Sequence, residues 1–328
     1  MRALVTGGTG FVGANLVAAL NDRGVEALVL HRESSSKRAL EGLVYESVIG
    51  NILDEPEALA RCMEGCDWVF HVAAVADYWR QGREWLYKVN VEGTRRVLQA
   101  AKLAGVRRLV FTSSLAAMGM PQEGELLTEE DEFNLRPEQF PYGHSKYLAE
   151  QEVQRAVEQG LKAVIVNPSI VLGARDLNQI SGSIVVEVAR GLVRFLPPGG
   201  ANYVAVEDVA AGHIAAAEKG RAGERYILGG ENLPSAEMVA LVAEVAGRPA
   251  PRLRLPAWLL PPAAWAVRGA RAVLGNRVPL DENQVRLLSR YIYADNRKAV
   301  QELDLPQTPV RTAVQRAYNW YNRNGVLG

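Results

Sequence analysis

Two side chains that could exchange a proton with a substrate lie four residues apart, in Tyr142-Gly143-His144-Ser145-Lys146. Residues at this spacing share one face of a helix, so the Tyr142 phenol and the Lys146 ammonium are expected to point the same way. A free tyrosine has a pKa of about 10, and a neighbouring cation favours the phenolate and lowers that value. A phenol tuned in this way can give a proton to a carbonyl oxygen or take one from an alcohol. Because the spacing is common by chance, its meaning depends on the surrounding elements.

A hydroxyl group is expected near this pair. Thr112-Ser113-Ser114 ends the apolar run Leu109-Val110-Phe111, which is typical of a buried strand. In a parallel sheet the carboxyl ends of the strands meet at one edge, where ligands bind. A serine hydroxyl at that edge can hold the oxygen atom of a substrate. For His144, inside the Tyr/Lys segment, a solvated or supporting role is favoured over catalysis.

A glycine-rich turn follows the first predicted strand and opens a helix. Residues 6–13 read T-G-G-T-G-F-V-G. Gly7 allows a tight turn, Gly10 lets the backbone approach a pyrophosphate, and Gly13 lets the helix pack on the strand. The helix N-terminus then offers free N–H groups and a partial positive charge to the phosphates. The pattern in this position predicts a dinucleotide-binding site.

The residues after the second strand bear on which dinucleotide binds. A site for NAD places an acidic side chain there to hold the ribose hydroxyls. This chain has His31-Arg32, followed by serines at 34–36 and by Lys37. An arginine with neighbouring hydroxyl groups suits a 2′-phosphate better than a diol, so NADP(H) is predicted rather than NAD. The alternative is that Arg32 is a solvated surface charge and that the site does not discriminate.

These motifs lie in a chain that alternates strands and helices. Short apolar runs predict strands at 3–6, 27–30, 44–49, 68–72, 109–111 and 163–166, and helical periodicity predicts helices at 11–20, 87–104 and 142–159. Buried strands separated by amphipathic helices specify a parallel sheet with helices on both faces. The prediction is an α/β, doubly wound Rossmann domain over residues 1–170. A smaller, mostly helical substrate domain is expected over residues 171–328.

Composition narrows the class of protein. The 328 residues carry 37 basic and 37 acidic side chains, and a net charge of zero argues against a general nucleic-acid-binding protein. Cys62 and Cys66 lie four apart in a predicted helix, a spacing that suits neither a disulfide nor, without further ligands nearby, a metal site. No signal peptide is recognised, and no apolar run reaches the roughly 20 residues of a membrane-spanning helix. A cytoplasmic location is therefore expected.

The chain resembles an extended short-chain dehydrogenase/reductase, within the superfamily of NAD-dependent epimerases and dehydratases. The resemblance runs nearly from end to end, and its motifs fall in the order and spacing of that family. Besides the glycine turn, they are Val72-Ala73-Ala74, Asn90 in Asn-Val-Glu-Gly-Thr, Ser114, Tyr142, Lys146, Asn167-Pro168, residues 203–210 (Y-V-A-V-E-D-V-A) and residues 226–230 (Y-I-L-G-G).

The resemblance implies a catalytic triad of Ser114, Tyr142 and Lys146, with Ser113 as the fallback serine. Asn90 would support the strand ends and a water relay, and an oxidised nicotinamide ring would help Lys146 to acidify the phenol. The residues expected to bind the cofactor are Thr6, Gly7, Gly10, Phe11, Val12, Gly13, His31, Arg32, Asn51, Ile52, Ala73, Ala74, Asn90, Tyr142, Lys146, Asn167 and Pro168. The residues expected near the substrate are Val75, Tyr78, Ser114, Met118 and Asn167.

Two subfamilies fit these residues. One is similar to dihydroflavonol 4-reductase and to related reductases of aldehydes, ketones and steroids, which exchange their cofactor. The other comprises nucleotide-sugar epimerases and dehydratases, which usually retain NAD, and the chain also resembles hopanoid-associated sugar epimerases. Arg32 favours the reductases, and so does Ala201, because nucleotide-sugar enzymes commonly place an arginine there to neutralise a diphosphate. Asn167 matches a position that epimerases use, and a non-catalytic cofactor-binding sensor is a third alternative.

The prediction is therefore an NADP(H)-dependent oxidoreductase that reduces a ketone or an aldehyde, with hydride passing between nicotinamide C4 and the carbonyl carbon. Tyr78 and Trp79 after the fourth strand, together with Met118, indicate a lipophilic or aromatic substrate, although ordinary core packing explains them equally well. The resemblance also implies a homodimer that packs through the helices at 87–104 and 142–159.

The C-terminal region is basic, with 13 basic and five acidic residues over 248–328. Within it, residues 255–267 read L-P-A-W-L-L-P-P-A-A-W-A-V, which is too short to cross a bilayer. Arg252, Arg254, Arg268 and Arg271 flank this run. Basic residues around Trp and Leu suit a weak contact with an anionic membrane surface. A lid over the substrate cleft or a dimer contact is the favoured interpretation.

Overall fold

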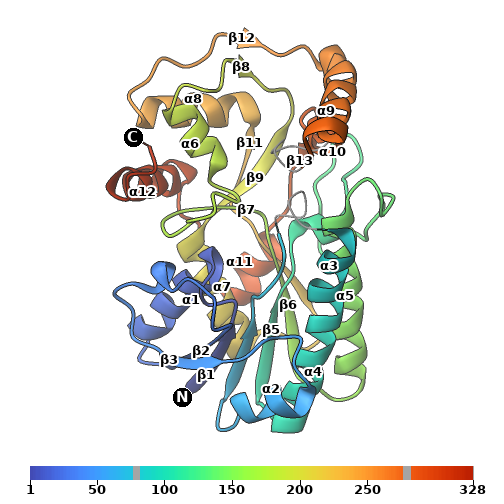
Figure 1. Cartoon of the computed structure of the whole chain (residues 1–328), viewed down its shortest axis with the longest axis vertical. Helices are drawn as coiled ribbons and strands as arrows, with labels where there is room; N and C mark the ends of the chain where they lie inside the picture. Colours follow the sequence, from blue (N-terminus) through green and yellow to red (C-terminus); the bar gives the residue numbers. More distant parts are fainter. Residues whose placement is uncertain (77–81, 276–281, 328) are drawn as a thin grey trace.

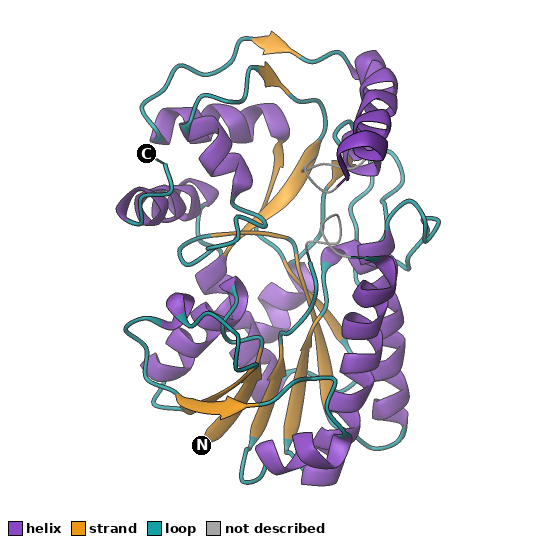
Figure 2. Ribbon diagram, viewed as in Figure 1, coloured by secondary structure: helices purple, strands orange, loops and turns teal. Residues whose placement is uncertain are grey.

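A seven-stranded parallel sheet occupies the lower half of the molecule as drawn in Figures 1 and 2. The computed structural model describes residues 1–76, 82–275 and 282–327. The strand order is β10-β6-β5-β4-β1-β2-β3. The strands are β1 (Arg2–Thr6), β2 (Glu26–His31), β3 (Glu46–Ile49), β4 (Trp68–His71), β5 (Arg108–Thr112), β6 (Ala163–Pro168) and β10 (Arg225–Leu228).

Helices cover both faces of this sheet (Figure 2). One face carries α1 (Phe11–Asp22), α7 (Val206–Lys219) and α11 (Arg297–Leu303), and the other carries α2 (Pro56–Cys62), α4 (Gly93–Ala104) and α5 (Pro141–Glu158). Successive residues of a strand point to opposite faces, so Ala3 and Val5 join one apolar cluster and Leu4 joins the other. Strands that are buried on both faces are what a parallel sheet requires, and the predicted doubly wound α/β fold is confirmed.

A smaller unit forms the upper half of the molecule. Its sheet is built on β9 (Gly200–Ala205), which pairs with β7 (Ile170–Leu172), β11 (Glu231–Pro234) and β13 (Tyr291–Ile292). Its helices α6 (Ser183–Ala189), α8 (Ser235–Val245) and α12 (Val310–Arg323) share one apolar cluster. At the far end lie the paired strands β8 (Phe195–Leu196) and β12 (Leu253–Arg254), the short turn η4 (Ala257–Leu259), and helices α9 (Leu260–Leu274) and α10 (Glu282–Leu287).

The chain passes between the two units several times, whereas the sequence analysis placed a single domain boundary after residue 170. After β9 it returns as α7, whose side chains Val206, Val209 and Ile214 join the core cluster of β1. It then adds β10 beside β6 as the seventh strand, and later α11 packs on α7 and β10. The segments 206–228 and 297–303 therefore belong to the large sheet, although they lie within the stretch predicted as the substrate domain.

The helix predicted at 87–104 is divided into three parts. They are α3 (Arg83–Tyr87), a π-helical turn η2 (Lys88–Glu92) and α4. Such turns insert one extra residue and are frequent at functional sites, and this one contains Asn90. The helix predicted to hold both cysteines is also shorter than expected, because α2 ends at Cys62; both thiols are free.

Within the described residues, no helix combines the length and the apolar character needed to cross a membrane.

At Gly13, helix α1 packs directly against the backbone of the glycine turn. A Cβ atom at Gly13 would lie 2.3 Å from the Gly7 carbonyl oxygen and 2.7 Å from the Gly8 Cα. These are backbone atoms, so they can yield only if β1 and α1 move apart. We expect Gly13→Ala to lower the free energy of unfolding by about 1–3 kcal/mol or more, measured by urea denaturation. Gly269→Ala is the matched control, because α9 leaves open space there and alanine favours helices. Wild-type stability of Gly13→Ala would refute this close packing.

Candidate active site

Most of the predicted site residues that the structure describes lie at the carboxyl edge of the large sheet. The strand register pairs Thr6 with His71 and His71 with Phe111, so β1, β4 and β5 end at the same level. β1 lies between β2 and β4. The sheet grows from β1 through β2 and β3 on one side and through β4, β5 and β6 on the other, so the strand order reverses at β1. In open α/β sheets, ligands bind outside the carboxyl ends of the strands at such a switch point.

The glycine turn presents bare backbone at this edge. Gly7 has a φ of +70°, and a Cβ there would lie 2.6 Å from the Ala73 backbone nitrogen. A Cβ at Gly10 would approach only the Gly7 oxygen, at 3.3 Å, so Gly10 is otherwise open. Helix α1 begins at Phe11 with no capping side chain and no acidic residue in its first turn. Its free N–H groups suit a pyrophosphate, so these residues fit a dinucleotide.

The residues expected around the adenosine differ in exposure. Arg32 follows β2 and is exposed, and its guanidinium makes no hydrogen bond or ion pair within the described part of the chain. His31 is buried, with Nδ1 2.9 Å from the Arg32 carbonyl oxygen and Nε2 2.6 Å from the Ser47 hydroxyl. Asn51 is half-buried, and Ile52 packs in the apolar core. Arg32 is therefore the accessible group of this set, while the His31 ring is engaged within the protein.

Ser114 and Tyr142 are brought into contact. Ser114 precedes the short turn η3 (Leu115–Met118), and its hydroxyl oxygen accepts a hydrogen bond from the Ala116 nitrogen at 3.2 Å. Tyr142 lies in the first turn of α5, and its side chain hydrogen-bonds with that of Ser114. The two hydroxyl groups meet at the sheet edge that also carries the glycine turn.

Lys146 lies one helical turn beyond Tyr142 and is 3% exposed. Its Nζ donates a hydrogen bond to the Thr112 carbonyl oxygen at 2.8 Å and lies 5.0 Å from the centre of the Phe111 ring. Burial lowers the pKa of Lys146 to about 8, and the Glu150 carboxylate opposes this effect.

The electrostatics of Tyr142 correct the sequence prediction. Burial raises the pKa of Tyr142, and the hydrogen bond with Ser114 only opposes this rise. The Lys146 ammonium is directed at the Thr112 carbonyl, so the loss of water around the phenol has the larger effect. The expectation that Lys146 acidifies the phenol is therefore wrong for the protein chain on its own.

A buried carboxylate lies behind Lys146. Glu150 is 2% exposed; its Oε1 accepts a hydrogen bond from Asn167 Nδ2 at 2.6 Å, and its Oε2 lies 3.4 Å from Arg225 Nη1. Asn167 Nδ2 also donates to the Ser114 carbonyl oxygen at 3.1 Å, whereas Asn167 Oδ1 has no partner among the described residues. Burial raises the pKa of Glu150, while Arg225 and Asn167 favour its charged form. Asn167 thus holds the backbone at Ser114.

A buried histidine that the sequence analysis did not single out connects the glycine turn to α4. Thr94 donates its hydroxyl proton to the Asn90 carbonyl oxygen, so it accepts a hydrogen bond from His71 Nε2 at 3.0 Å. Thr6 accepts from the Ala73 nitrogen and donates to His71 Nδ1 at 2.8 Å. Both ring nitrogens are satisfied only by a neutral imidazole, and burial lowers the pKa of His71 to about 3.

Asn90 extends this chain of hydrogen bonds to Tyr142. Its Oδ1 accepts from the Val75 nitrogen at 2.8 Å, and its Nδ2 donates to the Val75 oxygen at 3.1 Å and to the Ser145 hydroxyl at 3.0 Å. Ser145 in turn donates to the Tyr142 carbonyl oxygen at 2.7 Å. The π-helical turn places the Asn90 amide where it can make all these bonds. The sequence analysis identified Asn90 in these hydrogen bonds but not His71, for which the only sequence signal was a histidine at the end of an apolar strand.

The remaining predicted residues fall into different environments. Val75 and Ala73 are half-buried, Ala74 is exposed and Pro168 is buried. Met118 is fully buried in an apolar cluster with Leu115, Leu127, Ile227 and Ala294, which makes it a packing residue and corrects its assignment to the substrate. Tyr78 lies outside the described residues. His144 bonds through Nδ1 to the Tyr87 hydroxyl at 2.8 Å.

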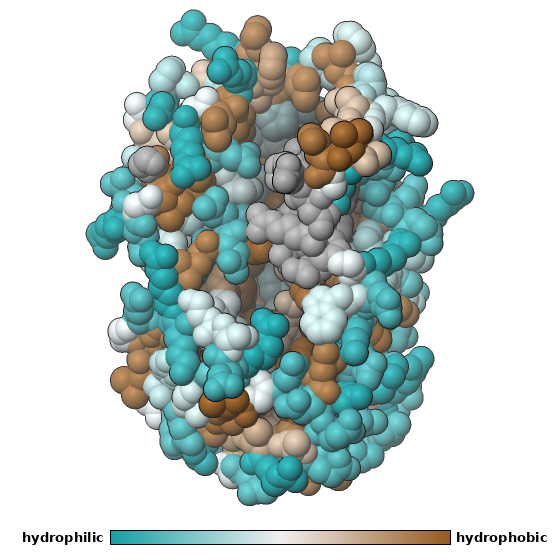
Figure 3. All heavy atoms as spheres, in the orientation of Figure 1, coloured by the Kyte–Doolittle hydropathy of each residue, from teal (hydrophilic) through white to brown (hydrophobic). Residues whose placement is uncertain are grey.

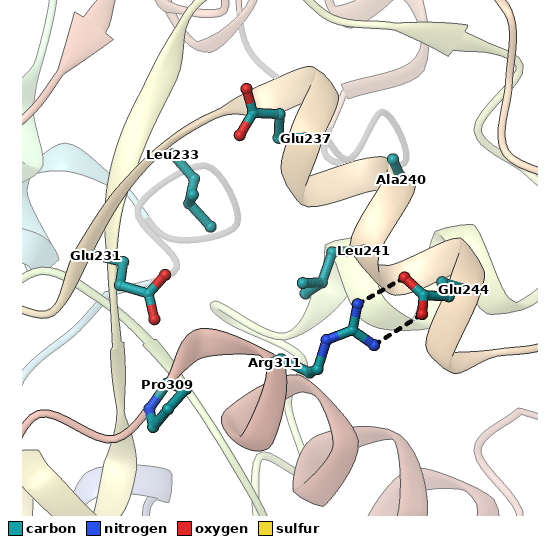
Figure 4. Close-up of a pocket in the computed structure, with 8 residues that line it drawn as sticks. All are labelled: Glu231, Leu233, Glu237, Ala240, Leu241, Glu244, Pro309 and Arg311. Carbon is teal, nitrogen blue, oxygen red and sulfur yellow. Dashed lines mark hydrogen bonds and ion pairs between the residues drawn. The ribbon is translucent and has the colours of Figure 1, made fainter.

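A surface hollow between β11, α8 and α12 lies away from this edge (Figure 4). Three of its four charged side chains already have partners within the protein, and the fourth, Glu237, is exposed. Glu231 accepts a hydrogen bond from the Val310 nitrogen at 2.8 Å, and Arg311 pairs with Glu244 at 2.6 Å. The hollow therefore does not compete with the sheet edge as the candidate site.

Comparisons with known proteins agree with this geometry. Residues 3–229 match the model of the NAD dependent epimerase/dehydratase family. The chain is 39% identical to "Putative dihydroflavonol 4-reductase" of Synechocystis, covering 98% of this chain and 95% of that one. It is 33% identical to "Sterol demethylase protein B" of Methylococcus capsulatus over the full length of both. The crystal structure of gox2253 superposes with a TM-score of 0.87 at 35% identity, covering 100% of this chain and 99% of that one.

A second buried histidine makes the stability of this region sensitive to pH. His213 on α7 accepts a hydrogen bond from the Thr112 hydroxyl at Nε2, at 2.7 Å, and donates from Nδ1 to the Val209 carbonyl oxygen at 2.8 Å. Burial lowers its pKa to about 4. The unfolded chain takes up a proton below a pH of about 6.5 that folded His213 does not accept until the pH approaches 4. Acidification therefore favours unfolding across this interval.

Between pH 7 and pH 5, we expect the free energy of unfolding to fall by about 2 kcal/mol more in the wild type than in His213→Gln. The measurement is urea denaturation at a series of pH values, in which the pH dependence is compared rather than the absolute stability. His144→Gln is the matched control and should change the dependence less, because His144 is only half-buried. The same pH dependence in His213→Gln and the wild type would contradict the burial of a neutral ring.

Proposed function

The chain belongs to the NAD dependent epimerase/dehydratase family, and we propose that it is an NADP(H)-dependent oxidoreductase that reduces a lipophilic or aromatic ketone or aldehyde to an alcohol. The observation that carries this proposal is the contact between the Ser114 hydroxyl and the Tyr142 phenol at the sheet edge beside the bare glycine turn. A cytoplasmic location and a homodimer through α4 and α5 are part of the same proposal.

In this proposal the Ser114 hydroxyl holds the substrate oxygen and Tyr142 donates a proton to it as negative charge develops. A bound nicotinamide supplies the hydride for the carbonyl carbon. The raised pKa of Tyr142 keeps the phenol protonated at neutral pH, which is the form that carbonyl reduction requires. Lys146 and the Asn90–Ser145 bonds hold the strand end and the first turn of α5 in place during proton transfer.

The proposal of NADP(H) is supported by the position of Arg32. The side chain is exposed, and it follows the strand whose end approaches the adenosine ribose in dinucleotide-binding folds. A free guanidinium can make two parallel hydrogen bonds to a phosphate, a geometry that a ribose hydroxyl pair does not need.

The proposal of a lipophilic carbonyl substrate is supported by the surroundings of Ala201. In the small sheet this residue pairs with Leu233 on one side and with Ile292 on the other. These three apolar side chains offer no charge to a diphosphate, which would be costly to bury without a cation. The sterol and dihydroflavonol in the names of the two relatives are uncharged ring molecules without a phosphate group. Asn167 favours the alternative of a nucleotide-sugar epimerase or dehydratase, because it matches a position that epimerases use and its Oδ1 has no partner among the described residues.

Replacing Tyr142 by Phe tests the proposed proton donor. We expect the kcat for NADPH-dependent carbonyl reduction to fall by about 10²–10⁴, because general acid catalysis is lost, with NADPH affinity retained. The assay is NADPH consumption with a panel of aliphatic, aromatic and steroid ketones and aldehydes, run beside a nucleotide-sugar panel. Tyr147→Phe removes a phenol from the same helix and should leave kcat unchanged.

Unchanged turnover in Tyr142→Phe would exclude this phenol as the proton donor. Conversion of a nucleotide sugar by the wild type without net NADPH consumption would instead establish the epimerase alternative.

Replacing Arg32 by Ala tests the choice of cofactor. We expect the dissociation constant for NADPH to rise by about tenfold or more, the value of a charge-assisted hydrogen bond, while that for NADH stays nearly the same. Fluorescence titration with both cofactors measures this difference. Arg61→Ala removes an exposed arginine from α2 and is the matched control. An Arg32→Ala protein that kept its preference for NADPH would refute the assignment.

A further inference from the structure

One end of the molecule exposes large apolar side chains instead of burying them. Among the described residues, 16 such side chains are exposed, and nine of them lie within 192–195 and 253–291. Figure 3 shows apolar atoms gathered at the upper end, over the elements that Figure 1 labels β8, β12 and α9. We call this surface the apolar end and define it by the exposed side chains Phe195, Leu253, Trp258, Trp265, Val273 and Leu274.

Helix α9 is apolar on the side that faces water. Its inner side carries Leu260 and Ala264, which pack with Val285 of α10. Residues at spacings of three and four lie along one face of a helix, and the outer face of α9 follows this spacing. The exposed residues of that face are Pro262, Trp265, Ala266, Gly269, Ala272 and Val273. Trp265 and Val273 are 64% and 84% exposed, which is unusual for a helix that meets only water.

Positively charged side chains predominate around this face. Residues 248–280 include six arginines and no aspartate or glutamate. Arg252 and Arg254 are exposed beside Leu253 on β12. Arg268 stacks 5.6 Å from the centre of the Trp265 ring and lies 3.5 Å from Glu282 of α10. The apolar end therefore combines Trp and Leu side chains with a fringe of guanidinium groups.

We propose that the apolar end docks on the surface of a bilayer that contains anionic phospholipids, with α9 lying along the interface. Tryptophan, valine and leucine side chains would enter the boundary between headgroups and acyl chains, and the arginines would meet lipid phosphates. A second copy of this chain is a poorer partner, because a symmetric contact would place the same arginines opposite each other. A lid is also a poorer interpretation, because a lid buries its apolar face against the protein. The inner face of α9 already packs on α10, and its outer face is left exposed.

Binding to vesicles tests this inference with the full-length chain. We expect the protein to co-sediment with phosphatidylcholine vesicles that contain phosphatidylglycerol at low salt, and about tenfold less with pure phosphatidylcholine or at high salt. The double variant Trp258→Glu/Trp265→Glu should lose about tenfold or more of the binding to anionic vesicles and the blue shift of tryptophan fluorescence.

The double variant Val44→Glu/Leu126→Glu is the matched control, because it adds the same charge at two apolar residues that are exposed elsewhere. Its binding to vesicles should fall only slightly, because two added negative charges weaken the attraction to anionic lipid. Retained NADPH binding checks that each variant is folded. Failure of the wild type to sediment with anionic vesicles would overturn the proposal. So would an equal loss in both double variants, or a dimer that the tryptophan substitutions convert to monomer in light scattering, which would assign this surface to a second copy.

Discussion

The candidate site depends on a neutral imidazole held between two hydroxyl groups. His71 accepts from Thr6 at the base of the glycine turn and donates to Thr94, which is bonded to Asn90. Protonation would place a second N–H against a hydroxyl whose proton already points at the ring, so burial and geometry both exclude the charged form. This chain of bonds fixes β1, β4 and α4 relative to one another. Through Asn90 and Ser145 it also fixes the turn that begins the helix of Tyr142.

The parts of the fold that the sequence predicts are those that local patterns encode. The glycine turn, the apolar strands and the spacing of Tyr142 and Lys146 all lie within short stretches, and the structure places them at one sheet edge. The return of α7 and β10 to the large sheet could not be predicted, because it depends on which apolar surface α7 covers. The role of His71 was equally hidden, since its partners lie 65 and 23 residues away in the chain.

Electrostatics show the same limit of local reasoning. The spacing of Tyr142 and Lys146 correctly predicts two side chains from one helix, but not that the ammonium is directed at the Thr112 carbonyl. Nor does it reveal that burial removes enough water to raise the pKa of the phenol. Charge and desolvation act in opposite directions, and only the three-dimensional surroundings decide which is larger. The result is a phenol that keeps its proton, as a donor to a carbonyl oxygen must.

Unsatisfied groups occur at two places in the protein, the carboxyl edge of the large sheet and the apolar end. At the sheet edge, the first N–H groups of α1 lack a side-chain cap, and Asn167 Oδ1 and Ser169 Oγ are buried without a partner among the described residues. Buried polar atoms are seldom left unpaired, so the donors on the glycine turn and the oxygen atoms at the end of β6 are available to a polar ligand. At the apolar end, apolar surface is left exposed on a helix that has arginines beside it. A polar ligand suits the first surface and an amphipathic one the second, because each supplies what the protein itself leaves unpaired.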